Sequence, residues 1–153
     1  MANVTPVPEG FSAVTPHLVV AGAADAIEFY TKAFGAEEKS RMPGPKGKLM
    51  YAEIEIAGAR VMLADEFPEF GSTGPQSGST SPVTIHLYVD DADAVFARAV
   101  EAGAKVTMPI EDMFWGDRYG KIEDPFGHSW AIATRKEDLS DQEIMSRAPT
   151  MEM

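Results

Sequence analysis

The chain has 153 residues, of which 44% are hydrophobic and 24% charged, a composition typical of one globular domain. It contains no cysteine, so disulfides, thiolate metal sites and cysteine nucleophiles are excluded. The net charge of −11 repels polyanions and anionic lipid, so we expect neither nucleic acid nor membrane as a partner. No apolar stretch approaches the roughly 20 residues of a membrane span. No secretory signal is recognisable either, and we expect a cytoplasmic protein.

The first half of the chain begins with an extended arm, residues 1–11, which contains two prolines. Residues 14–20 are short, apolar and rich in β-branched side chains, which predicts a buried strand. An apolar stripe at helical spacing predicts a helix over residues 23–34, and Gly35 stands where a left-handed residue would end it. Three more strands are expected near residues 37–42, 49–56 and 60–64.

The second half repeats this pattern after a linker, residues 66–82, that is rich in glycine, proline and serine. Residues 83–89 match residues 14–20 at five of seven positions, with an offset of 69 residues. A helix is expected over residues 92–102, before Gly103. Three strands follow near residues 105–108, 119–122 and 129–133.

The repeat predicts an α+β fold made of two βαβββ modules in tandem. We place the first module at about residues 12–65 and the second at about 83–136, together forming one domain over residues 12–136. Residues 137–153 are expected to be a tail with one short helix, because Ser140 and Glu143 fit a capping box.

Several motifs resemble the glyoxalase/bleomycin resistance protein/dioxygenase superfamily, also called the vicinal oxygen chelate (VOC) superfamily, and in particular its PhnB-like branch. They are Thr15-Pro16-His17-Leu18, Phe34-Gly35-Ala36 and Asp124-Pro125-Phe126-Gly127. The resemblance implies an incomplete barrel with a central cleft, and a homodimer. It does not decide the activity, because this scaffold carries lyases, isomerases, dioxygenases, thiol transferases and drug-sequestering proteins.

Metal-binding members of that superfamily carry four ligands, usually His and Glu, at equivalent places in the two modules. By resemblance, these places fall on Thr15, Met62, Thr84 and Ala131. None is a good ligand for a divalent ion, so no metal cofactor is expected.

Two histidines leave an alternative open. His17 and His86 each lie two residues after one of these threonines, so strand alternation places them on the same face. If that face lines the cleft, they could hold one divalent metal (Zn, Ni, Mn or Fe) together with Glu53 or Glu55. They could equally be partly buried histidines hydrogen-bonded to hydroxyl groups or to the backbone.

Residues 115–119 form the most concentrated polar and aromatic cluster of the chain. Arg118 could clamp a carboxylate or phosphonate, and Trp115 could stack on a flat ligand. Alternatively, Asp117 and Arg118 could pair to hold the loop while Trp115 plugs the end of the barrel. His128, which follows the turn at residues 124–127, is expected to be exposed.

Glu53 is the best candidate for a general base, provided that the polar face of its strand points into the cleft. If that face points outward, Glu53 is an ordinary solvated carboxylate. Met62 could contribute to a soft, adaptable lining of the cleft.

The sequence thus supports three hypotheses. The first is a protein that binds a small organic molecule, aromatic or cationic, in the cleft between the modules without a metal. The alternative is a metal-dependent lyase, isomerase or dioxygenase that uses His17 and His86. The third is a structural or regulatory dimer with a vestigial cleft. The residues predicted to contact the small-molecule ligand are His17, His86, Met62, Tyr88, Trp115, Arg118 and Tyr119.

Overall fold

The computed structural model describes residues 3–76 and 78–149 and contains the two βαβββ modules. Parts of the predicted arm, linker and tail lie outside these ranges, namely residues 1–2, 77 and 150–153. The first module consists of β1 (His17–Val20), α1 (Ala23–Phe34), β2 (Glu37–Pro43), β3 (Leu49–Ile56) and β4 (Ala59–Asp65). The second consists of β5 (Thr84–Tyr88), α2 (Ala92–Ala102), β6 (Lys105–Asp112), β7 (Asp117–Glu123) and β8 (Ser129–Arg135). Short 3-10 turns at Pro45–Gly47 and Pro68–Phe70 and the helix α3 (Asp141–Arg147) complete the described elements.

Each module folds into one four-stranded mixed sheet, with the strand order β1-β4-β3-β2 in the first and β5-β8-β7-β6 in the second. β1 is parallel to its neighbour β4, and β5 to its neighbour β8. All other neighbouring strands are antiparallel. His17 lies opposite Met62, and His86 opposite Ala131, so the two pairs are related by the 69-residue offset of the repeat. The predicted α+β fold and its internal duplication are confirmed, and the described strands do not close into a barrel.

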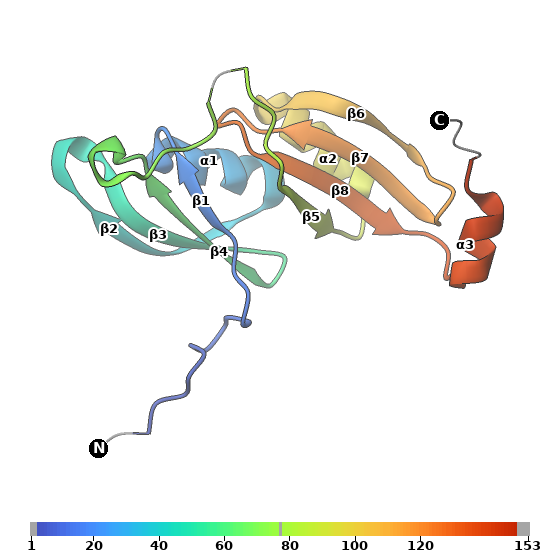
Figure 1. Ribbon diagram of the computed structural model, residues 1–153, viewed down its shortest axis with the longest axis horizontal. Helices are drawn as coiled ribbons and strands as arrows, with labels where there is room; N and C mark the ends of the chain where they lie inside the picture. The colour runs from blue at the N-terminus through green and yellow to red at the C-terminus, as the bar shows by residue number, and fades with distance from the viewer. Residues whose placement is uncertain (1–2, 77, 150–153) are drawn as a thin grey trace.

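The two sheets lie side by side, with β1 and β5 toward the middle and β2 and β6 toward the outer edges (Figure 1). α1 and α2 pack against each other, and each also packs against strands of its own module. The N-terminal arm points away from the body, and α3 lies at the far end of the second module (Figure 1). Each sheet therefore has one face covered by helices and one that is largely uncovered.

The hydrophobic core crosses from one module to the other. Trp130 of β8 is 1% exposed, and its ring lies 4.7 Å from that of Phe34 and 5.4 Å from that of Tyr30, both on α1. Phe126, in the turn before β8, packs against Phe29 of α1 at 6.4 Å. These aromatic contacts therefore join the two modules through a shared core.

A buried carboxylate ties the same elements together. Asp124 is 3% exposed, and its Oδ2 accepts hydrogen bonds from the Tyr30 hydroxyl at 2.5 Å and from Trp130 Nε1 at 2.9 Å. Its Oδ1 accepts from the backbone N–H groups of Phe126 at 2.9 Å and His128 at 3.0 Å. Burial, and then the neighbouring Asp124 charge, raises the pKa of Tyr30 well above its ordinary value, so this phenol keeps its proton.

The two long helices begin in related ways. Asp65, at the end of β4, accepts hydrogen bonds from the backbone N–H groups of Gly22 and Ala23, at 2.8 and 2.9 Å. Thr134, 69 residues further along, accepts from the N–H of Ala92 at the start of α2, at 2.8 Å. Both satisfy backbone donors that have no partner within the helix.

The second module differs from prediction at its edge strand. β6 extends to Asp112 and so includes Pro109, although the sequence predicted an end near Met108. The register between β6 and β7 shifts on both sides of Met108, and a proline is tolerated where an edge strand leaves its ladder. None of the helices in the described ranges has the length and apolar character needed to cross a membrane.

Candidate functional site

A cavity of about 530 Å³ lies between β1 and β5, where the two modules meet. Each module contributes equivalent residues: Thr15 and His17 come from the first, and Thr84 and His86 from the second. His128 also lines the cavity, so all three histidines of the chain face it. Its remaining lining is mostly apolar and includes Val14, Leu18, Val83 and Ile85.

Strand alternation explains how the two related histidines reach this place. On β1, Leu18 and Val20 are buried in the core, so His17 lies on the uncovered face. On β5, Leu87 is buried, and His86 lies on the uncovered face. The repeat thus brings two histidines, one from each module, to a single cavity.

His128 is positioned by the turn before β8 and by a contact with β1. The turn before β8 is held by Asp124, and the ring nitrogen Nε2 of His128 lies 2.9 Å from the carbonyl oxygen of Val19 on β1. Because a carbonyl only accepts, Nε2 must carry the proton and donate it. His128 is half-buried rather than exposed, which corrects the expectation from sequence. It bridges the modules beside the cavity.

An aromatic cluster adjoins the cavity at His86. The ring of His86 lies 4.5 Å from that of Tyr88 and 5.8 Å from that of Tyr119, and Trp115 lies 5.2 Å from Tyr119. Asp117, 4% exposed, fixes two members, because its Oδ2 accepts from the Tyr88 hydroxyl at 2.8 Å and from Trp115 Nε1 at 3.1 Å. The hydrogen bond from Tyr88 to Asp117 raises the pKa of Tyr88, and burial adds a smaller increase, so the phenol stays neutral. Four of the predicted ligand-binding residues are therefore brought together.

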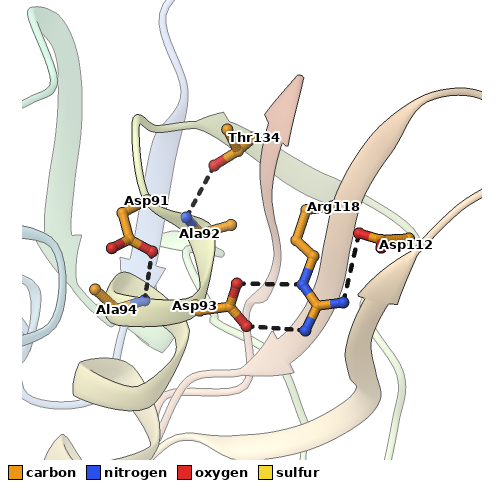
Figure 2. A network of polar contacts seen from close by, with 7 residues as sticks. All are labelled: Asp91, Ala92, Asp93, Ala94, Asp112, Arg118 and Thr134. Carbon is orange, nitrogen blue, oxygen red and sulfur yellow. Dashed lines mark hydrogen bonds and ion pairs between the residues drawn. The ribbon is translucent and has the colours of Figure 1, made fainter. Parts of the chain in front are cut away.

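Arg118 lies on the opposite face of the same sheet. Its guanidinium makes two hydrogen bonds to Asp93 of α2, at 3.0 and 3.1 Å, and a third to Asp112 at 3.4 Å (Figure 2). The hydrogen bond from Arg118 lowers the pKa of Asp93. Arg118 and Asp117 do not pair with each other, because successive residues of β7 point to opposite faces. The structure thus places Arg118 between sheet and helix, away from the cavity.

The first module carries a counterpart of the aromatic cluster. The rings of His17 and Tyr51 lie 6.3 Å apart, edge to face, whereas those of His86 and Tyr119 in the second module lie 5.8 Å apart and are tilted. Met62 stands opposite His17 on β4. Burial, with a smaller effect of the Glu53 charge, raises the pKa of Tyr51. Tyr51 was not predicted as a site residue, because the 69-residue offset pairs it with Gly120; only the strand register aligns it with Tyr119.

Glu53 lies on this uncovered face but does not line the cavity. Its carboxylate is paired with Arg60 at 3.5 Å, with side-chain exposures of 17% and 20%. This carboxylate is therefore oriented toward Arg60 rather than toward the cavity. The structure therefore gives Glu53 no position from which to take a proton in the cavity.

The side chains around the cavity do not fit the divalent metal of the superfamily. Across residues 3–76 and 78–149, no three His, Cys, Asp or Glu side chains come together as a group that could hold an ion. The four positions implied by resemblance carry threonine, methionine, threonine and alanine. His17 and His86 would need a carboxylate partner, and both predicted candidates are engaged, Glu53 by Arg60 and Glu55 by Lys39.

Comparison with known proteins agrees with the fold. The family model of the Glyoxalase/Bleomycin resistance protein/Dioxygenase superfamily matches residues 11–132. The chain belongs to this superfamily. The resemblance inferred from its motifs is thereby confirmed.

Three relatives illustrate how far the likeness extends. The chain is 50% identical to the uncharacterized protein Rv0887c of Mycobacterium tuberculosis, over 88% of this chain and 81% of that protein. The X-ray structure of the Arabidopsis thaliana gene product At5g48480 is similar with a TM-score of 0.66 and 31% identity, over 80% of this chain and 98% of that one. The PhnB protein of Bacillus cereus shares the fold at a TM-score of 0.64 and 19% identity, over 80% of this chain and 99% of that one.

Proposed function

We propose that this member of the superfamily binds a small organic molecule in the cavity between β1 and β5. The observation that carries the proposal is the cavity itself, about 530 Å³ in volume and lined by apolar residues together with the hydroxyl and imidazole groups of Thr, Ser and His. Sites for small molecules usually have this size, with an apolar wall and polar groups that orient the ligand. Both modules supply equivalent residues, so the duplication creates the site.

The aromatic cluster extends this site on one side. His86 belongs to both the cavity and the cluster, so a ligand that leaves the cavity on that side meets Tyr88 and Tyr119. Flat rings offset-stack on such side chains, and each pair contributes about 0.5–1.5 kcal/mol beyond the area it buries. A ligand with a planar, apolar body therefore suits the site.

The proposed role is binding rather than metal-dependent catalysis. The side chains near the cavity do not suit the usual metal, and Glu53 is turned toward Arg60. One observation favours the alternative of a metal-dependent lyase, isomerase or dioxygenase, namely that His17 and His86 line the same cavity. Metal analysis of protein purified without chelator or affinity tag separates the two, because the alternative requires near-stoichiometric metal that is lost in a His17→Ala, His86→Ala double variant.

We also propose that the chain forms a homodimer. Apolar side chains on β2, β3 and β6 stay exposed in the single chain, among them Met42, Met50 and Met108, at 53%, 54% and 39%. A second copy that covered them would remove this apolar surface from water. Light scattering combined with size-exclusion chromatography tests the dimer directly.

We further propose a cytoplasmic location, because the absence of cysteine suits a reducing compartment.

The binding proposal is tested with N-phenyl-1-naphthylamine, a neutral two-ring dye whose fluorescence rises in apolar surroundings. Thr84→Trp fills the cavity from its wall, and Thr107→Trp places the same side chain on the exposed edge strand β6 as a control. We expect Thr84→Trp to weaken dye binding by about tenfold or more, equivalent to about 1.4 kcal/mol. Thr107→Trp should stay within about twofold of the unmodified protein. No dye binding, or equal binding by both variants, would contradict the proposal.

A further inference from the structure

The distribution of charge around the cavity is unlike that of the rest of the chain. The protein contains 24 acidic residues, 13 Lys and Arg, and three histidines. The cavity is lined by all three histidines and by no Asp, Glu, Lys or Arg. A ligand inside it meets imidazole, hydroxyl and apolar groups. It does not meet the carboxylates that dominate the surface.

The cavity offers hydrogen-bond donors that are not used within the described chain. No hydrogen bond from the described residues reaches the ring of His17 or of His86, and each ring carries at least one N–H. The hydroxyl groups of Thr84 and Ser129 lie 3.2 Å apart and share one hydrogen bond, so one hydroxyl proton remains to be donated. These groups can serve an oxygen acceptor on a ligand.

Three carboxylates around this region are already occupied. Glu53 is paired with Arg60, and Asp117 accepts from Tyr88 and Trp115. Asp124 receives four hydrogen bonds and is 3% exposed. The cavity lining therefore offers a cationic ligand no carboxylate, whereas its imidazole and hydroxyl groups can donate hydrogen bonds to an anion.

Building on the proposed function, we infer that the ligand of this cavity is an organic anion. It has a flat apolar body and one carboxylate, sulfonate or phosphonate group whose oxygens accept hydrogen bonds from His17 and His86. The apolar body occupies the cavity beside His86 and extends toward Tyr88. Since the net charge of −11 repels anions at long range, the preference arises from contacts inside the cavity and persists when salt screens that repulsion.

Two dyes that differ by one group test the inference. 8-Anilinonaphthalene-1-sulfonate has the ring system of N-phenyl-1-naphthylamine with an added sulfonate. In 0.15 M salt we expect the sulfonate dye to bind about tenfold tighter than the neutral dye, because hydrogen bonds to a charged acceptor are the stronger kind. His17→Phe combined with His86→Phe keeps two aromatic rings and removes their N–H groups. This variant should lose the tenfold preference while still binding the neutral dye.

A control removes a positive charge elsewhere. Lys105→Gln, on the exposed edge strand β6, should leave the preference for the sulfonate dye unchanged. Equal affinities for the two dyes, or tighter binding of a cationic dye such as auramine O, would overturn the inference and leave the binding proposal standing. If neither dye binds, or if Thr84→Trp weakens neither, the binding proposal itself fails.

Discussion

The buried carboxylate of Asp124 joins the two modules, and replacing it by asparagine tests that role. Four donors converge on its two oxygens: the hydroxyl of Tyr30, the indole N–H of Trp130, and the backbone N–H groups of Phe126 and His128. Asparagine retains one acceptor oxygen and turns an NH₂ group toward the other two donors. At least two hydrogen bonds are lost, whichever way the amide is turned.

The size of the effect follows from these contacts. A hydrogen bond to a charged group contributes about 1.5–3 kcal/mol, so two lost bonds give about 3–6 kcal/mol. Asparagine no longer buries a charge, and this gain offsets part of the loss. We therefore expect Asp124→Asn to lower the free energy of unfolding by about 3 kcal/mol, a large part of the 5–15 kcal/mol of a typical domain. Tyr30→Phe removes one donor and should lower it by about 1.5 kcal/mol.

Urea denaturation at pH 7 measures both changes through tryptophan emission, because Trp130 is 1% exposed and becomes solvated on unfolding. Asp138→Asn serves as a control, since this carboxylate is 88% exposed and pairs with Arg135 on the surface. It should change the unfolding free energy by less than about 0.5 kcal/mol. A loss below about 1 kcal/mol for Asp124→Asn, or a loss equal to that of the control, would refute the reasoning.

Three further predictions concern stability. Since the pKa of Tyr30 is raised by burial and by Asp124, the unfolded chain releases this proton first as the pH rises above about 10. The unfolding free energy should then fall with pH, and Tyr30→Phe should reduce that slope by up to about 1.4 kcal/mol per pH unit in urea titrations from pH 10 to 11. An unchanged slope would contradict this. Gly127 has φ +92° and a Cβ there would lie 2.7 Å from a linker proline, whereas Gly58 has φ +85° and open space. Gly58→Ala should lower the unfolding free energy by about 1 kcal/mol, and Gly127→Ala should lower it by more because its methyl group would also collide with the linker. Equal losses in the two variants would show that the linker contact is unimportant. Asp65→Ala leaves three backbone N–H groups without their acceptor, whereas Thr134→Val leaves one. Asp65→Ala should therefore lower the melting temperature more than Thr134→Val does. The reverse order would contradict this account of how the helices begin.

The helices and the repeat could be predicted because their signals are local and occur twice. α1 and α2 have the predicted bounds, since an apolar stripe marks each helix and a glycine ends it. Gly35 and Gly103 have φ of +70° and +123°, in the range that favours glycine. The 69-residue offset then identifies the equivalent strands, and the pairing of β1 with β4 and of β5 with β8 keeps it.

The candidate site could be predicted only where strand alternation was unambiguous. His17 and His86 were expected on one face and both line the cavity. For residues 115–119, the sequence did not show which side chains share a face. Tyr119 lies with the aromatic cluster, whereas Arg118, one residue earlier, points to α2. A shift of one residue reverses the face of every side chain in a strand.

His128 could not be placed from the sequence because its partner is remote. The ring bonds to Val19, 109 residues earlier in the chain, and no histidine stands at the equivalent position of the first module. Local pattern indicates only that the residue follows a turn, and turns are usually at the surface. The contact depends on how the two modules pack, which a single sequence does not reveal.

The central claim is that a small molecule binds between β1 and β5, and the three histidines report on it directly. Because the chain has only three, ¹H–¹³C spectra of the imidazole Cε1–H groups contain three signals, assignable by single substitutions. Titration with N-phenyl-1-naphthylamine should shift all three signals with one common dissociation constant. Dye binding that leaves all three histidine signals unmoved would contradict the claim.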